Sequence, residues 1–124
     1  MVEKSQRLED AKSEQLLKKA WHAVDREEAE RLLFTAPLGS YLFRKDHFAS
    51  CLEEILVRAK KGRMNCYTLT YLGTDQQVRE KTVVHWNDHW LFYDDDPSLM
   101  GRSFTSLEIL LRSLGSALTK PLAL

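Results

Sequence analysis

The chain carries no surplus of charge of either sign. Its 124 residues include 18 lysines and arginines and 18 aspartates and glutamates, so the formal net charge is zero at pH 7. A neutral chain has no general attraction to nucleic acid or to an anionic membrane surface. Binding to either is therefore not expected, and any site for an anion must be built locally from a few basic side chains.

Features that would point away from the cytosol are also missing. No apolar run approaches the length that spans a membrane. The polar start, M-V-E-K-S-Q-R-L-E-D, does not have the apolar stretch of a signal peptide. The two cysteines, Cys51 and Cys66, lie in apolar patterns that are typical of reduced core thiols. We therefore expect a cytosolic protein.

A hydrophobic fraction of 44% and a charged fraction of 29% are ordinary for one globular domain of this length. Residues 1–20 are interpreted as an N-terminal helical extension, and residues 21–124 as the domain itself, with a helical insert at about 46–63. Helix starts are indicated by Asp25 as an N-cap with Glu28 three residues later, and by T-S-L-E from Thr105 as a capping box. β-branched and aromatic runs predict strands at Tyr41–Arg44, Cys66–Leu72, Val78–Trp86 and His89–Tyr93.

Arg44 closes the uninterrupted apolar run Tyr41-Leu42-Phe43, which is typical of a strand covered on both faces. An arginine at the end of a buried strand needs a partner, because an unpaired buried charge is costly. Two interpretations remain open. Arg44 is either the surface end of the strand or half of a structural ion pair, or it is the floor of a pocket for a carboxylate or phosphate, whose oxygens suit a planar guanidinium.

Arg26 is a second basic residue in an unusual place. It lies in the first turn of the helix that follows Asp25, where a positive charge is unfavourable against the helix dipole unless an anion is nearby. The alternative is a solvated arginine that pairs with Glu30 one turn later. The position is a weak indication of an anion site.

An amphipathic helix is predicted between Asp46 and Gly62 from its apolar spacing, with Asp46 as the N-cap. Because this helix begins two residues after Arg44, amides near His47 to Ser50 could bind an anion there. The other interpretation is a packed helix with no ligand contact. A carboxylate would repel phosphate, so we expect Asp46 to cap the helix or to pair with Arg44 while the pocket is empty.

Several segments, taken in order, resemble the Src homology 2 domain, the phosphotyrosine-binding module. They are V-D-R-E-E-A-E-R-L-L, G-S-Y-L-F-R, C-Y-T-L-T, V-V-H-W and F-T-S-L-E-I-L-L, and the resemblance covers Trp21 to about Leu122. The sequence departs from the family at Phe43, where valine or isoleucine is usual. It also has a helical insert in place of the short phosphate loop, and a shortened final loop. In these two respects it is similar to members found in effectors of intracellular bacteria.

The resemblance implies an α+β fold with a central antiparallel sheet flanked by two helices, to which the N-terminal and inserted helices are added. It implies non-catalytic binding of phosphotyrosine in peptides or proteins by a monomer, without a cofactor and with weak selectivity for flanking residues. Arg44 would grip the phosphate and Arg26 would support it from the side. The remaining pocket residues would be Thr68, His85, His47 and Ser50. For an effector, the compartment would be the host-cell cytosol and the target host tyrosine-kinase signalling.

Other functions are weighed against this one. A structural protein-interaction domain of the same fold would no longer bind phosphate. Asp46 favours it, as does Asn87, which stands where many family members carry a lysine. An enzyme is not expected, because the four histidines and two cysteines give no nucleophile with a placed base. A metal site at His85, Asp88 and His89 is not expected either, because no further strong ligand is suitably spaced.

Overall fold

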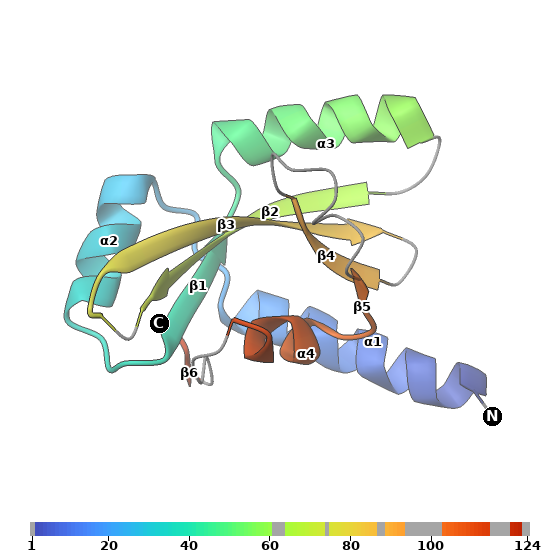
Figure 1. Cartoon of the computed structure of the whole chain (residues 1–124), viewed down its shortest axis with the longest axis horizontal. Helices are drawn as coiled ribbons and strands as arrows, with labels where there is room; N and C mark the ends of the chain where they lie inside the picture. Colours follow the sequence, from blue (N-terminus) through green and yellow to red (C-terminus); the bar gives the residue numbers. More distant parts are fainter. Residues whose placement is uncertain are drawn as a thin grey trace.

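The computed structural model describes residues 2–60, 64–73, 75–86, 89–93, 103–114 and 120–122. Helices and strands alternate irregularly along the chain, which makes the protein an α+β structure (Figure 1). The elements are α1 (Val2–Lys19), α2 (Arg26–Phe34), β1 (Ser40–Arg44), α3 (His47–Lys60), β2 (Met64–Leu72), β3 (Val78–Trp86), β4 (His89–Tyr93), β5 (Ser103–Phe104), α4 (Leu107–Arg112) and β6 (Lys120–Pro121).

The strands form one sheet in the order β5-β4-β3-β2-β1-β6. All neighbours are antiparallel except β1 and β6, which are parallel, so the expectation of an antiparallel sheet is wrong at this edge. The outer edge of β1 is shared by two distant segments. The Phe43 N–H donates to Ala20 O at 2.8 Å, and the Leu122 N–H donates to Tyr41 O at 2.8 Å. Both segments satisfy backbone groups that an edge strand would otherwise expose.

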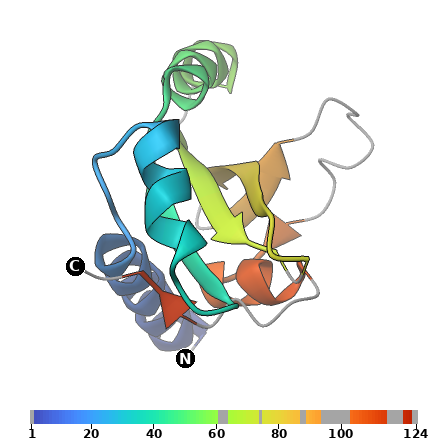
Figure 2. The same cartoon turned by 90° about the vertical axis from the view of Figure 1, so that its left-hand side faces the viewer.

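Helices α1 and α4 cover one face of the sheet, which is its lower face in Figures 1 and 2. Because side chains alternate along a strand, Tyr41 and Phe43 of β1 point to this face. There they join a buried apolar cluster with Trp90 and the α4 residues Leu107, Leu110 and Leu111. Helix α1 belongs to this packing, since Leu16 and Leu17 pack against the cluster and Ser13 Oγ accepts a hydrogen bond from the Leu107 N–H at 3.1 Å.

Helices α2 and α3 cover the opposite face at its two ends. Asp25 caps α2 by accepting a hydrogen bond from the Glu28 N–H at 2.9 Å, and Ala29 and Leu33 pack on Leu42 of β1. At the other end, α3 packs on Met64, Cys66, Val84 and Leu91 through Ala49 and Leu52. The two helices thus leave the centre of this face between them, and Arg44 lies there on the same face as Leu42.

Some boundaries and burials differ from the sequence prediction. Helix α4 has Ser106, not Thr105, as its N-cap, since Ser106 Oγ accepts a hydrogen bond from the Ile109 N–H. Cys66 is buried as expected, but Cys51 is exposed. The reason is that α3 buries a narrower stripe than its apolar pattern suggests, so Phe48 is also exposed.

Trp21, where the resemblance to the Src homology 2 family begins, makes a single parallel bridge to Phe43. The expected helix end at Gly62 lies outside the described residues, as do Asn87 and Asp88. None of the helices within the described ranges is both long enough and apolar enough to cross a membrane.

Candidate functional site

The Arg44 side chain lies at the end of β1, in the space between α2 and α3, and is only 4% exposed. Its guanidinium is held on one side by two side chains. Nε donates a hydrogen bond to Thr70 Oγ1 at 3.3 Å, and Nη2 donates to Glu80 Oε1 at 2.6 Å. Glu80 comes from β3, where it lies across from Thr70 of β2. The partner that the buried arginine requires is therefore a carboxylate two strands away.

Glu80 also faces the second arginine of the predicted site. Its Oε1 lies 3.7 Å from Arg26 Nε, which in turn donates a hydrogen bond to Glu30 Oε1 at 3.1 Å. The hydrogen bond to Glu30 and the charge of Glu80 both raise the pKa of Arg26. Arg26 therefore pairs with Glu30 one turn later, as the alternative interpretation expected, and the Glu80 carboxylate is a second negative charge near the start of α2.

Asp46 fulfils both roles expected of it. Its Oδ1 accepts a hydrogen bond from the Ala49 N–H at 2.8 Å, which caps α3, and its Oδ2 lies 3.9 Å from Arg44 Nη2. The local cap therefore fixes a second carboxylate beside the arginine. Around Arg44 the charges of two basic and two acidic side chains balance.

Two threonine hydroxyls accompany Arg44 on the same face of the sheet. Thr68 lies directly across from Arg44 in the β1–β2 register, and Thr70 lies across from Leu42. Thr68 is 2% exposed, and its Oγ1 finds no hydrogen-bond partner among the described residues. A buried hydroxyl without a partner is costly. Thr68 therefore offers a donor next to Arg44 that a bound oxyanion would satisfy.

A cavity of about 450 Å³ adjoins Arg44 and Asp46, whereas Arg26, Thr68, Thr70 and Glu80 do not line it. One wall is the junction of β1 and α3, and the other is the segment that leads into α2. The lining residues are Arg44, Lys45, Asp46, His47, Trp21, Ala23, Val24 and Asp25. The wall near α2 is apolar at Trp21, Ala23 and Val24 and ends at the Asp25 carboxylate, whereas Arg44, Lys45, Asp46 and His47 line the floor and the α3 wall. This division suits a ligand with an anionic end and a flat apolar body.

Of the predicted site residues, the structure brings Arg44, Arg26 and Thr68 to this face of the sheet, with His47 at the cavity wall. Ser50 is exposed on the first turn of α3 and does not line the cavity. His47 Nε2 lies 3.5 Å from Cys51 Sγ on the outside of the same helix. The insert thus borders the cavity through its N-terminal residues.

His85 is not brought to Arg44. The β2–β3 register places Thr82 across from Thr68, and His85 three residues further along β3 across from Asn65. An odd step along a strand also reverses the face. His85 accordingly lies against Trp90 on the α1–α4 side, with ring centroids 3.9 Å apart and planes 4° apart. The sequence interpretation of His85 as a pocket residue is not supported by this geometry.

Glu80 and Thr70 are the site residues that sequence reasoning missed. Glu80 alternates with Thr82 and Val84 along β3, so a carboxylate shares its face with a buried valine. That pattern signals a carboxylate in need of a partner. It does not identify Arg44 as that partner, because the register between two strands depends on tertiary packing.

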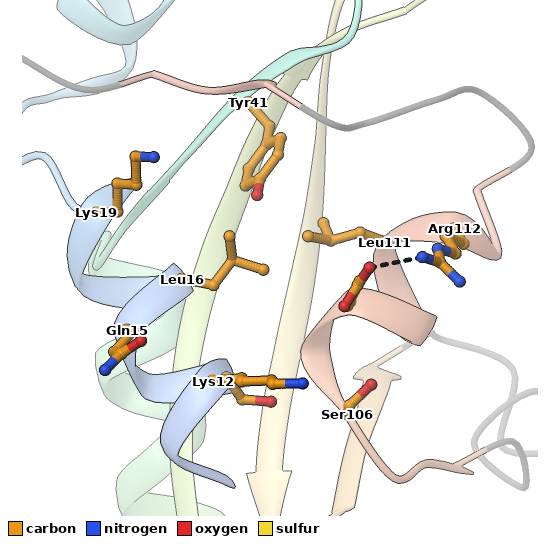
Figure 3. A pocket seen from close by; sticks show the side chains of 10 residues that line it. Lys12, Gln15, Leu16, Lys19, Tyr41, Ser106, Leu111 and Arg112 are labelled. Carbon is orange, nitrogen blue, oxygen red and sulfur yellow. Dashed lines mark hydrogen bonds and ion pairs between the residues drawn. The ribbon is translucent and has the colours of Figure 1, made fainter. Parts of the chain in front are cut away.

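A second cavity, of about 400 Å³, lies on the opposite face between α1 and α4. Figure 3 shows the Tyr41 hydroxyl directed into it between Leu16 and Leu111. Lys12, Lys19 and Arg112 stand at its rim, and Arg112 pairs with Glu108 at 2.6 Å. Burial, reinforced by the charge of Glu108, raises the pKa of Tyr41. The sheet separates this cavity from Arg44, so the two do not form one site.

Among the residues with described positions, no three histidine, cysteine, aspartate or glutamate side chains gather as a metal site would require. Burial raises the pKa of Cys66 to about 11, so this thiol is protonated at neutral pH. Comparison with protein-family models gives no match to this chain, and comparison with curated proteins gives none either.

Proposed function

We propose that the protein binds phosphotyrosine in peptides or proteins, with Arg44 as the main phosphate ligand. The observation that carries the proposal is a guanidinium only 4% exposed, at the floor of a cavity and next to the unpartnered Thr68 hydroxyl. A guanidinium can hold two phosphate oxygens at once. The Thr68 hydroxyl can donate to a third oxygen, and the partner it lacks would then be supplied.

Arg26 supports the same assignment. It approaches within 3.7 Å of the Glu80 oxygen that Arg44 also binds, so the two arginines converge on one point. A phosphotyrosine carries about −1.5 to −2 charges at neutral pH and three acceptor oxygens. A phosphate at that point would bridge the arginines, which a singly charged group does less strongly.

The depth of Arg44 favours tyrosine over serine as the phosphorylated residue. A phosphate must pass the cavity walls to reach an almost fully buried guanidinium, and a phenyl ring extends further from the peptide backbone than a serine side chain. The apolar wall formed by Trp21, Ala23 and Val24 suits the face of such a ring. These features together favour a long, flat side chain that ends in phosphate.

The wider setting belongs to the same proposal and rests on the sequence resemblance. In the family that the sequence resembles, a short connection between α4 and β6 implies weak selectivity for residues that flank the phosphotyrosine. The helix between β1 and β2 goes with a bacterial effector that acts on host tyrosine-kinase signalling in the host cytosol. A monomer that needs no cofactor is sufficient for this activity.

The proposal is tested by a fluorescence-polarisation titration with a phosphotyrosine peptide, its unphosphorylated twin and a phosphoserine version. Arg44→Leu should weaken binding by at least about 100-fold, since each charged hydrogen bond contributes roughly 1.5–3 kcal/mol. Arg112→Leu removes an exposed arginine on the far face and should leave affinity unchanged. Circular dichroism establishes that both variants fold. Equal binding of the phosphorylated and unphosphorylated peptides would overturn the proposal.

One observation favours a second function, a structural interaction domain that does not bind phosphate. The Arg44–Glu80 pair at 2.6 Å already gives the buried arginine a partner, as a purely structural ion pair would. In that case neither phosphopeptide would bind at any peptide concentration tested, although the protein is folded. The same titration therefore decides between the two functions.

A further inference from the structure

We infer that Glu80 is an internal competitor of the ligand, and that phosphate binds by taking the place of its carboxylate. This inference rests on the proposed function and deepens it, because it names a residue that determines which anions the site accepts. One oxygen of Glu80 lies 2.6 Å from Arg44 and 3.7 Å from Arg26. That is the point at which a bridging phosphate would have to sit.

The charges around Arg44 make an exchange necessary. Arg44 and Arg26 are balanced by Glu80 and by Asp46, which lies 3.9 Å from Arg44. Glu30 adds a further negative charge beside Arg26. A doubly charged phosphate that joined this group would meet three carboxylates against two arginines, and Lys45, which lines the same cavity, is already paired with Glu53. Like charges at close range repel strongly in a poorly solvated site. One carboxylate must therefore leave.

Glu80 is the carboxylate that can leave at the lower cost. Asp46 is retained by the Ala49 N–H at 2.8 Å, and its departure would uncap α3. Glu80 has only the two arginines as partners among the described residues. Its side chain is 27% exposed, so rotation about its own bonds brings the carboxylate into water without movement of the strand.

An internal competitor sets a minimum strength of interaction with the arginines that a ligand must exceed in order to bind. A tethered carboxylate acts at a high effective concentration, and it reduces the apparent affinity of every anion that must displace it. Singly charged groups such as a carboxylate or a sulfate ester then bind too weakly to matter. A phosphate monoester, with nearly two charges, remains able to compete. Glu80 thus restricts the site to phosphate monoesters.

The test is Glu80→Gln, which keeps the shape of the side chain and removes its charge. Titrated with the phosphotyrosine peptide by fluorescence polarisation, it should bind about tenfold more tightly than the unchanged protein, equivalent to about 1.4 kcal/mol. Binding of a matched sulfotyrosine peptide should become detectable. The control Glu108→Gln removes a paired glutamate on the far face of the sheet and should bind as before.

The outcomes separate the two proposals. If the unchanged protein binds the phosphopeptide and Glu80→Gln binds equally or more weakly, the inference is overturned and the proposed function stands. If neither protein binds, the proposed function fails and the inference fails with it. If only Glu80→Gln binds, the proposed function fails for the unchanged protein, and the inferred displacement of Glu80 by phosphate fails with it.

A measurement on the unchanged protein tests the inference even if Glu80→Gln does not fold. The carboxyl ¹³C signals of Glu80 and Asp46 are followed by NMR as the phosphotyrosine peptide is added. Displacement should shift the Glu80 signal, because its carboxylate exchanges arginine contacts for water, while the Asp46 signal moves less. A Glu80 signal that stays in place at saturation would overturn the inference.

Discussion

The face of the sheet that α1 and α4 cover is filled by large apolar side chains, whereas the centre of the opposite face carries Arg44, Thr68, Thr70 and Glu80. On the apolar face each side chain is stabilised by many neighbours at once. On the charged face each group depends on one or two specific partners, and the hydroxyl of Thr68 has none among the described residues. Stability is therefore concentrated on one face, and the capacity to exchange partners on the other.

The charged centre of this face borders a small apolar region that α3 covers. Under α3, Cys66 and Val84 form a small apolar cluster, and the Glu53 carboxylate accepts a hydrogen bond from the Cys66 N–H at 3.0 Å. The cluster holds α3 in place, and Asp46 at its start borders Arg44. The site thus has a rigid wall on one side although its own groups are not packed by apolar contacts.

The largest effect should come from the apolar face. Leu110→Ala removes a fully buried side chain of α4 and should lower the free energy of unfolding by about 2–5 kcal/mol through lost burial and the cavity left behind. Ile109→Ala, at a neighbouring position that is 44% exposed, should cost much less. Urea denaturation followed by circular dichroism measures both. Equal losses would mean that α4 does not carry the core.

The apolar cluster under α3 contains Cys66, and the titration of this thiol should lower the stability of the protein at high pH. Burial, and less strongly the charge of Glu53, raises the pKa of Cys66 to about 11 from an ordinary value of 9.0. Between these values the unfolded chain releases a proton that the folded chain keeps, so stability falls as the pH rises, by up to about 3 kcal/mol. Urea denaturation at pH 8 to 11 should show a smaller fall for Cys66→Ala. An identical fall would place the titration elsewhere.

In the charged centre, the loss of stability caused by a substitution at Arg44 should depend on whether Glu80 keeps its charge. Arg44→Met leaves Glu80 without its main partner and should cost about 2 kcal/mol of unfolding free energy, less than for a fully enclosed pair because the Glu80 side chain is 27% exposed. Adding Glu80→Gln to this variant should recover part of the loss. A double-mutant cycle from urea denaturation tests this coupling. Strictly additive effects would show that the two side chains act independently.

The smallest effect should come from the wall of the site. Asp46→Ala removes the cap of α3 and should lower the free energy of unfolding by about 1 kcal/mol. Asp46→Asn keeps a capping oxygen while it removes the charge, so its stability should stay close to that of the unchanged protein. Thermal unfolding compares the two. A large loss in the Asn variant would assign the stabilisation to the Arg44 contact instead of the cap.

Much of the fold could be predicted because local patterns determine it. The bounds of β3 agree with the alternation in V-R-E-K-T-V-V-H-W, and the caps at Asp25 and Asp46 follow from side chains that bond their own helix. The parallel pairing of β6 with β1 was missed, because residues 120–121 carry no local strand pattern and pair only through contact with a distant edge. Propensity is a weak guide where tertiary contacts decide.

The candidate site was predicted in part for the same reason. Arg44 and Arg26 conflict with their local surroundings, and such conflicts are visible in the sequence. The Glu80 partnership and the true position of His85 depend on strand register, which only the assembled sheet defines. Thr68 alternates with Tyr67 and Leu69 along β2, so the strand pattern alone places it on the opposite face from them, and it lies across from Arg44. Its burial depends on α2 and α3, which no strand pattern predicts.

The position of α3 between β1 and β2 has a consequence for the order in which the protein folds. Strands β2, β3 and β4 follow one another along the chain and pair as neighbours, so their contacts close short loops. Pairing of β1 with β2 must instead close a loop that contains the 14 residues of α3, and longer closures are entropically more expensive and slower. We expect the three-stranded meander to form first and β1 to dock last. Arg44 would then meet Thr70 and Glu80 only in the final step, and hydrogen exchange at the β1 amides would report the earliest opening of the native sheet.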